Sequence, residues 1–207
     1  MKSAIRIATE ADAAAIAGIY APAVLEQPTS FEAVAPDARE FAARVANTLV
    51  RYPWLVCEQD GVVVGYAYAC AHRERAAYRW SVDVSAYISR SAHRRGIGRA
   101  LYTSLFRILE LQGFRNAYAG ITLPNPASEG LHRACGFALV GVYHHVGYKR
   151  GAWHDVAWFE RPIADTLIDP PEPIPFPAIR ASDAIAMALK TFSGGDASAA
   201  TDERRET

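Results

Sequence analysis

The sequence predicts an α/β protein in which helices cover the faces of a mixed β-sheet. Two apolar runs, residues 54–58 and 62–71, are joined by Asp60-Gly61, which is a strong signal for a β-hairpin. Residues 97–112 repeat apolar side chains at helical spacing. The predicted elements follow the order β-α-α-β-β-β-α-β-α-β-β, which differs from the regular alternation of strand and helix in a doubly wound sheet.

In the first third of the chain we expect a short strand over residues 4–7 and a helix over residues 10–20. Thr9 is the expected N-cap of this helix. A second helix is expected to open at Pro36, because large apolar side chains then recur every four residues, at Phe41, Val45 and Leu49.

The middle of the chain carries the clearest patterns. A third long strand is expected over residues 78–89, after the hairpin. The helix over residues 97–112 buries Ile97, Leu101, Leu105 and Ile108 and ends at Gly113. We then expect a strand over 116–123, a short helix over 127–135, and strands over 137–148 and 156–159.

After Arg161 the composition changes. Six of the twelve prolines lie between Pro162 and Pro177, which predicts an extended linker. Residues 182–192 are expected to form one or two amphipathic turns, and the Gly, Ala, Ser and charged residues of 193–207 predict disorder. We therefore expect one domain over residues 1–161 and an acidic appendage over residues 162–207.

Charge is unevenly distributed along the chain. Lys plus Arg and Asp plus Glu number 22 each, which argues against a protein that binds nucleic acid through bulk positive charge. Residues 1–161 nevertheless hold 18 basic and 14 acidic residues, and residues 162–207 hold 4 and 8. Seven arginines fall between Arg73 and Arg99, against Glu74 and Asp83. This stretch is expected to serve an anion.

Cysteine usage and hydropathy bear on the compartment. The three cysteines (Cys57, Cys70 and Cys135) are widely spaced and odd in number, which indicates no disulfide framework and favours a reducing compartment. The N-terminus lacks the pattern of a signal peptide, and no apolar run has the length of a membrane span. The expected location is the cytoplasm, with no membrane partner.

The segment from Ala92 to Arg99 lies between a strand and a helix and contains the two glycines Gly96 and Gly98. Glycine lets a backbone approach a ligand closely, and free amides at a helix N-terminus favour phosphate. The alternative is a glycine-containing turn with solvated arginines. The Walker loop pattern is absent, and the dinucleotide fingerprint would need a glycine where Leu101 stands.

This segment resembles the pyrophosphate loop of the GNAT acyltransferases, (Q/R)-x-x-G-x-(G/A), with His93 at the first position as a mild departure. Beyond the loop, the sequence over about residues 4–161 resembles the phosphinothricin acetyltransferases and their relatives that acetylate methionine sulfoximine and arsinothricin. The residues that carry this resemblance are Arg51-Tyr-Pro-Trp-Leu-Val56, Trp80-Ser-Val-Asp-Val-Ser85, Ala100-Leu-Tyr-Thr103, Gln112-Gly-Phe114, Leu123-Pro-Asn125, Leu131-His132, Gly136-Phe137, Gly147-Tyr-Lys149 and Trp153-His-Asp-Val156.

The resemblance implies the GNAT fold, a mostly antiparallel central sheet with acetyl-coenzyme A lying between two splayed parallel strands. It implies acetyl transfer from acetyl-coenzyme A to the α-amine of a glutamate-like amino acid by direct attack, and a homodimer formed near residues 147–155. It also implies cofactor contacts from the backbone of the strand before the loop, from the loop and from the start of the short helix: Ala86, Tyr87, Ile88, Arg94, Arg95, Gly96, Ile97, Gly98, Arg99 and Asn125.

The family's catalytic carboxylate is a Glu on the strand before the loop, and Asp83 occupies that position here. Because Asp is one methylene shorter, we expect it to act through a water molecule. The alternative is a carboxylate that pairs with Arg73, Arg75 or Arg79. For the leaving group, many GNAT enzymes use a Tyr, where this chain has His132. His132 is either a proton donor or a hydrogen-bonded structural histidine.

Substrate contacts are implied for the loop after the second hairpin strand, for the strand residues beside Asp83 and for a lid-like segment after the first helix: Phe31, Arg73, Glu74, Arg75, Val84 and Ser85. The alternative for the two arginines is a solvated turn. A further departure is Ala21-Pro22, where relatives often carry Asn. His144, His145 and His154 lack the acidic companions of a metal site, so no metal is expected.

Two other functions stay open at this point. One is a GNAT acetyltransferase for a different amine, such as a protein N-terminus or a polyamine. The other is a non-catalytic module that binds acyl-coenzyme A. The arginines beside Asp83 favour an anionic amino acid, since a polyamine site would need acidic lining.

Overall fold

A computed structural model describes residues 2–189 and 192–193 of the chain. Its strands are β1 (Lys2–Ile7), β2 (Trp54–Gln59), β3 (Val62–Ala71), β4 (Ser81–Ile88), β5 (Asn116–Thr122), β6 (Ala138–Lys149), β7 (Ala152–Pro162) and β8 (Phe192–Ser193). Its helices are α1 (Ala13–Leu25), α2 (Ala38–Leu49), α3 (Ile97–Gln112), α4 (Pro126–Ala134), α5 (Phe176–Ile179) and α6 (Asp183–Ala188), with short 3-10 turns at Glu10–Asp12, Ala76–Tyr78 and Arg90–Ala92.

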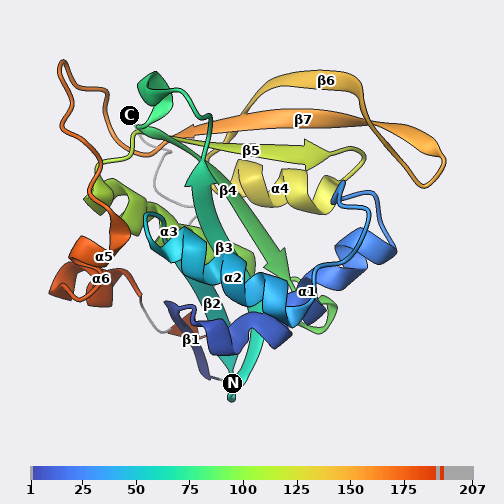
Figure 1. The fold of residues 1–207 in the computed structure, drawn as a ribbon, viewed down its shortest axis with the longest axis horizontal. Helices are drawn as coiled ribbons and strands as arrows, with labels where there is room; N and C mark the ends of the chain where they lie inside the picture. The colour runs from blue at the N-terminus through green and yellow to red at the C-terminus, as the bar shows by residue number, and fades with distance from the viewer. Residues whose placement is uncertain (1, 190–191, 194–207) are drawn as a thin grey trace, which may run out of the picture.

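The strands form one mixed sheet in the order β6-β7-β5-β4-β3-β2-β1-β8 (Figure 1). Neighbouring strands are antiparallel except for β4 and β5, which are parallel. This parallel pair is in register only from Ser81 to Asp83 and from Asn116 to Tyr118. Beyond these residues the two strands diverge, so the edge of β4 that faces β5 has no strand partner.

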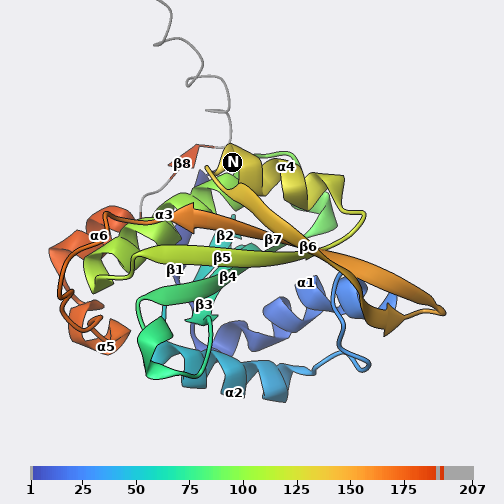
Figure 2. The same ribbon diagram turned by 90° about the horizontal axis from the view of Figure 1, so that it is seen from above.

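Helices cover both faces of the sheet, as predicted (Figure 2). On one face, α3 packs Leu101, Leu105 and Ile108 against the sheet. On the other face, α1 and α2 bury a second cluster that includes Ile16 and Phe41. The observed architecture confirms the predicted mixed α/β class.

Several element boundaries match the sequence patterns. The helix α3 and the strand β3 have the predicted bounds, and Gly113 ends α3 with a left-handed φ of 90°. Asp60 and Gly61 both have positive φ, the conformation that a two-residue hairpin turn requires.

Other boundaries differ from the predictions for local reasons. The helix α1 continues past Tyr20 and through Pro22 to Leu25. The side chain of Asp37 accepts a hydrogen bond from the Glu40 amide, so α2 begins at Ala38 and not at Pro36. The strand predicted from residue 78 begins at Ser81, after a 3-10 turn. Pairing with β6 extends β7 well beyond the predicted residues 156–159.

The segment after Pro162 has no helix or strand as far as Pro175, and then contacts the core. Phe176 is fully buried, and Ile185 and Ala188 of α6 pack in the same core cluster as α3. The side chain of Gln112 donates a hydrogen bond to the carbonyl of Ile174 at 2.7 Å. The proline-rich composition did not indicate this packing. Residues 194–207, for which disorder was predicted, lie outside the described residues.

Candidate active site

A cavity of about 990 Å³ opens where β4 and β5 diverge. It passes between the two strands and reaches α1 on one side and the N-termini of α3 and α4 on the other. Most of the predicted cofactor residues line it: Ala86, Tyr87, Ile88, Arg94, Gly96, Ile97, Gly98, Arg99 and Asn125. Val84, Ser85 and His132 also line it, whereas Arg95, Phe31, Arg73, Glu74, Arg75 and Asp83 lie outside this lining.

The N-terminus of α3 presents backbone amides to the cavity. Gly96 is its N-cap, with a left-handed φ of 76°, and no side chain caps the first turn. The uncapped amides and the partial positive charge of the helix end suit a phosphate group. Arg94 and Arg99 line the same end of the cavity, and Arg95 is exposed beside them.

Gly98 has a role that the sequence did not indicate. A Cβ at this position would lie 2.9 Å from Cδ2 of Leu131. The missing side chain therefore lets the first turn of α3 approach α4, whereas Gly96 is required for its positive φ. The close approach brings the N-termini of both helices to one cavity.

Tyr87 belongs to the aromatic core beneath α1. Its ring lies 4.9 Å from that of Tyr20 and 5.4 Å from that of Tyr66, measured between centroids. Burial raises the pKa of Tyr87 well above its usual value, so this phenol stays protonated. Its neighbours Ala86 and Ile88 face the α3 side of the sheet.

Asn125 is the N-cap of α4. Its side-chain oxygen accepts a hydrogen bond from the amide of Ser128 at 3.1 Å. This bond orients the short helix, whose first residues line the cavity.

His132 is buried, and both of its ring nitrogens are engaged. Nδ1 lies 2.8 Å from the carbonyl oxygen of Ser128, which can only accept, so Nδ1 carries the proton. Nε2 then accepts from the hydroxyl of Tyr102 at 3.0 Å. Burial lowers the pKa of His132, which keeps the ring neutral near pH 7. Tyr102 was not among the predicted site residues, because its position in the buried helix α3 gave no sign of a partner from α4.

Asp83 faces the α1 side of the sheet, since its neighbours Val82 and Val84 pack in the α3-side core. Its Oδ1 lies 2.6 Å from Nδ1 of His72. The predicted alternative of an arginine partner is wrong. Arg79 pairs with Glu172, and the guanidinium of Arg73 lies over the ring of Trp158. Burial raises the pKa of Asp83, and the hydrogen bond with His72 opposes this shift.

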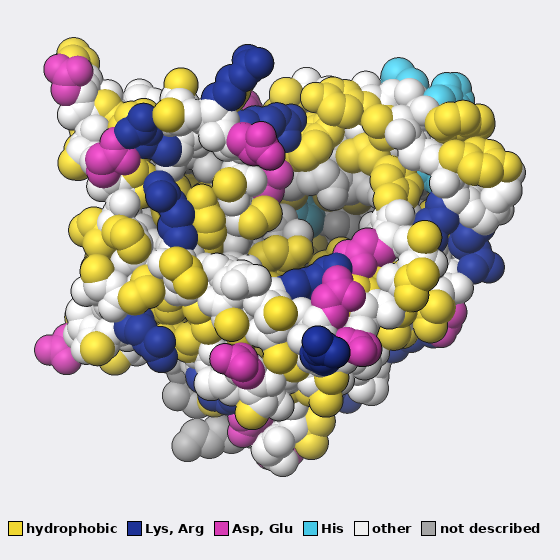
Figure 3. Space-filling model, viewed as in Figure 1, with side chains coloured by type: hydrophobic (Ala, Val, Ile, Leu, Met, Phe, Trp, Pro, Cys, Tyr) yellow, Lys and Arg dark blue, Asp and Glu magenta, His cyan; other side chains and the backbone are white. Residues whose placement is uncertain are grey.

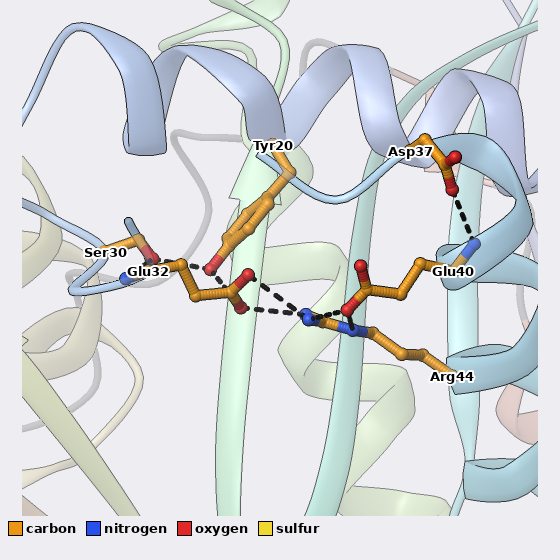
Figure 4. A network of polar contacts seen from close by, with 6 residues as sticks. All are labelled: Tyr20, Ser30, Glu32, Asp37, Glu40 and Arg44. Atoms are coloured by element: carbon orange, nitrogen blue, oxygen red, sulfur yellow. Dashed lines mark hydrogen bonds and ion pairs between the residues drawn. The ribbon is translucent and has the colours of Figure 1, made fainter. Parts of the chain in front are cut away.

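A polar network anchors the loop between α1 and α2 (Figure 4). The hydroxyl of Tyr20 lies 2.6 Å from that of Ser30 and donates to Glu32 at 3.1 Å. Arg44 of α2 donates two hydrogen bonds to Glu32, at 2.8 and 3.2 Å. Burial alone would raise the pKa of Glu32, but the hydrogen bonds from Arg44 and Tyr20 outweigh it and lower the pKa.

Phe31, the predicted lid residue, lies in this loop and touches the β6–β7 hairpin. The ring of Phe31 occupies the space that a Cβ at Gly147 would need, and Lys149 donates to the carbonyl of Ser30 at 2.5 Å. The loop therefore bridges α1 and β6 on the face that carries α1 and α2. That face is hollowed at its centre, where acidic and basic side chains meet at the edge of the hollow (Figure 3).

The arginine-rich stretch divides into paired and unpaired members. Arg79 and Arg90 form ion pairs with Glu172 and Glu26. The other five have no ion-pair partner within residues 2–189: Arg73, Arg75, Arg94, Arg95 and Arg99. Three of these lie at the N-terminus of α3 and two lie in the loop after β3, so free positive charge gathers at two places.

Two further findings concern the described part of the chain. It contains no group of three or more His, Cys, Asp or Glu side chains placed to hold a metal ion. None of its helices combines the length and hydropathy needed to cross a membrane.

Comparison with known proteins gives consistent results. The profile of the acetyltransferase (GNAT) domain matches residues 5–158. The chain is 39% identical over 170 residues to a phosphinothricin N-acetyltransferase of Streptomyces viridochromogenes, covering 82% of this chain and 92% of that protein. It is 35% identical over 157 residues to an L-methionine sulfoximine/L-methionine sulfone acetyltransferase of Salmonella typhimurium, covering 75% and 92%.

Among solved structures, a phosphinothricin acetyltransferase of the GNAT superfamily from Sinorhizobium meliloti, in complex with acetyl-coenzyme A, superposes with a TM-score of 0.79. The two sequences are 38% identical, and the match covers 84% of this chain and 96% of that one.

Proposed function

The chain belongs to the GNAT acetyltransferase family, and on this premise we propose that it moves the acetyl group of acetyl-coenzyme A to the α-amine of a glutamate-like amino acid or a toxic analogue. The observation that carries the proposal is the cavity between β4 and β5, with an uncapped helix N-terminus at one end and with Val84 and Ser85, which follow Asp83 on β4, in its lining. Relatives with 35–39% identity act on phosphinothricin and methionine sulfoximine.

The residues at the α3 end of the cavity fit acetyl-coenzyme A. The amides of Ile97 and Gly98 and the arginines beside them would hold the pyrophosphate. The unpaired edge of β4, from Val84 to Ile88, offers backbone groups to the extended pantetheine arm. A thioester placed along this edge would have its carbonyl beside amides that polarise it as it becomes tetrahedral.

Two groups undergo proton transfer in this proposal. The substrate ammonium must lose a proton before its nitrogen can attack, and Asp83 supplies the negative charge that favours this loss. The departing thiolate must be protonated or stabilised. Neutral His132 holds its own proton on the carbonyl of Ser128 and accepts from Tyr102 at Nε2, so in this proposal it fixes the Tyr102 hydroxyl at the cavity wall, and the thiolate takes its proton from the attacking nitrogen.

Arg73 and Arg75 would bind the acidic groups of the substrate, and Phe31 would cover it. Support comes from the lack of ion-pair partners for these arginines within residues 2–189 and from the anchored loop that carries Phe31. Val84 and Ser85 line the cavity between Asp83 and the cofactor end. Glu74 has no contact that assigns it a role.

We also propose a homodimer in the cytoplasm. The β6–β7 hairpin exposes the apolar side chains Val140, Tyr143, Val146, Tyr148 and Trp153, which a second copy would cover. Three free thiols favour a reducing compartment. Light scattering in solution is expected to give the mass of two chains.

The experiment that tests the reaction measures coenzyme A thiol released from acetyl-coenzyme A. Phosphinothricin, methionine sulfoximine and arsinothricin are compared with spermidine and with a peptide that has a free N-terminus. We expect turnover with the amino-acid analogues. Turnover only with the peptide or the polyamine would overturn the substrate class, and thiol release with none of the amines would favour a module that only binds acyl-coenzyme A.

A further inference from the structure

His72, which belongs to none of the predicted site residues, forms a pair with Asp83. Nδ1 of His72 lies 2.6 Å from Oδ1 of Asp83, and the two side chains are 12% and 25% exposed. A carboxylate that accepts from Nδ1 fixes the tautomer of an imidazole and leaves the lone pair of Nε2 free to take a proton. Within the described residues, Nε2 of His72 has no hydrogen-bond partner.

Neighbouring rings hold the imidazole in place. It stacks on Tyr118 of β5, with 4.3 Å between centroids, and meets Tyr78 and Trp158 edge to face. Because Tyr118 is the last residue of β5 that pairs with β4, the ring lies where the two strands begin to diverge. Ser85, two residues after Asp83 and on the same face, already lines the cavity.

The other titratable groups around the pair are poor competitors for the substrate proton. Burial, followed by the charge of Asp83, raises the pKa of Cys70 to about 11, and burial raises the pKa of Tyr118. Both therefore stay protonated near pH 7. The positive charge of Arg73 favours the ionised form of Asp83.

The pair also compensates for the short side chain of Asp83. Asp83 lies opposite Cys70 in the β3–β4 register, so His72 follows just past the end of β3 on the same face. An imidazole hydrogen-bonded to the carboxylate extends the reach of the basic group by the width of the ring. A water molecule would supply the same reach without a fixed direction.

We propose that His72 is the catalytic base of this acetyltransferase, with Asp83 as the residue that orients and charges it. This inference rests on the proposed function. An N–H bond of the substrate ammonium breaks as the Nε2–H bond of His72 forms. The freed nitrogen lone pair attacks the thioester carbonyl carbon. As the C–N bond forms and the C–S bond breaks, the thiolate takes the second proton of the attacking nitrogen and leaves as the thiol. The product is then a neutral amide, and the imidazolium later returns its proton to solvent.

Two substitutions separate this role from simple packing. His72→Phe keeps a ring against Tyr118 but has no basic nitrogen, and His72→Ala leaves space that free imidazole can enter. We expect both to lower kcat about 100-fold or more near pH 7, the usual contribution of a general base. The loss should shrink at high pH, where the substrate amine is already neutral, and added imidazole should restore His72→Ala but not His72→Phe.

His144 offers a matched control, because its Nδ1 also lies 2.8 Å from a carboxylate, that of Asp155, but on the exposed β6–β7 hairpin. His144→Phe should keep wild-type kcat. The proposal is overturned if His72→Phe keeps kcat within about threefold of wild type, or if imidazole restores no activity to His72→Ala. Absence of turnover in the wild-type protein contradicts the proposed function itself, and is measured in the same assay.

Discussion

At the N-terminus of α3, two glycines separated by one residue serve different physical purposes. Gly96 has a left-handed φ and open space around its Cα, whereas Gly98 has an ordinary φ and Leu131 against it. A side chain at position 96 would therefore strain the backbone, and one at position 98 would push α4 away. The direction of the free amides at the start of α3 therefore depends on the left-handed backbone of Gly96.

Gly96→Ala should cost about 1–2 kcal/mol of stability, the penalty of a left-handed L-residue. Relief of the strain would move the first amides of α3, so we also expect KM for acetyl-coenzyme A to rise about tenfold, which corresponds to about 1.4 kcal/mol. Gly61→Ala is the matched control, because Gly61 also has positive φ and open space but lies in the β2–β3 turn. If both variants change this KM equally, the amides of α3 do not hold the cofactor.

The residues of the site differ in how far the sequence predicts them. The loop from Arg94 to Arg99 is contiguous, so its pattern was sufficient to place it. The partner of Asp83 was not predictable, because His72 comes from the end of another strand and its approach depends on the β3–β4 register. Charge alone favoured the neighbouring arginines, and these are engaged elsewhere or lie in solvent.

At the scale of elements, the loop between α1 and α2 is the part of the site whose position depends on side chains. Glu32 ties Tyr20 of α1 to Arg44 of α2, and Phe31 precedes it directly. Side chains of the sheet also hold the backbone of this loop: Thr122 donates to the carbonyl of Thr29 at 3.5 Å, and Lys149 donates to that of Ser30 at 2.5 Å. These bonds and the network in Figure 4 together set where Phe31 lies.

Glu32→Gln should raise KM for the amine about fivefold, which corresponds to a loss of about 1 kcal/mol of binding free energy, and should leave KM for acetyl-coenzyme A unchanged.

The wild-type network should also make the stability of the protein depend on pH. Because the folded state lowers the pKa of Glu32, its contribution is complete above the ordinary value of about 4.3 and is lost as pH falls through the folded value.

Urea unfolding of the wild-type protein and of Glu32→Gln between about pH 3 and pH 6 checks the direction in which stability changes with pH. The variant should show a weaker fall in stability than wild type over this range. Equal pH dependence in the two proteins would contradict the role of Glu32 in anchoring the loop.

Local patterns predict an element well when its own residues contain the signals that determine it. The helix α3 shows its full periodicity and its terminal glycine, and the hairpin turn shows its Asp-Gly pair. The strand β7 was predicted at a fraction of its length, because its first two residues are exposed, the next three are only partly buried, and this part is held by pairing with β6 and not by an apolar face. Such pairing depends on two segments together, so the pattern of one segment alone does not predict it.

For the whole molecule, the neutral net charge conceals two regions with different roles. Arginines without an ion-pair partner in the described residues gather at the N-terminus of α3 and in the loop after β3, whereas the segment after Pro162 carries acidic residues, one of which, Glu172, pairs with Arg79. The same segment contributes to the core through Phe176 and α6. The described part of the appendage is therefore packed onto the catalytic region.

Phe176→Ala measures how much of the stability depends on this packing. Phe176 is fully buried in the cluster that contains Leu105 and Phe114, so its truncation should cost about 3–5 kcal/mol. Ile168→Ala, a truncation in the same segment at a side chain that is 96% exposed, should change stability by less than about 0.5 kcal/mol. Urea unfolding of the full chain measures both. Equal, small effects would mean that the segment is a loose linker, and a large effect of Phe176→Ala alone would make it part of the folding unit that holds the active site.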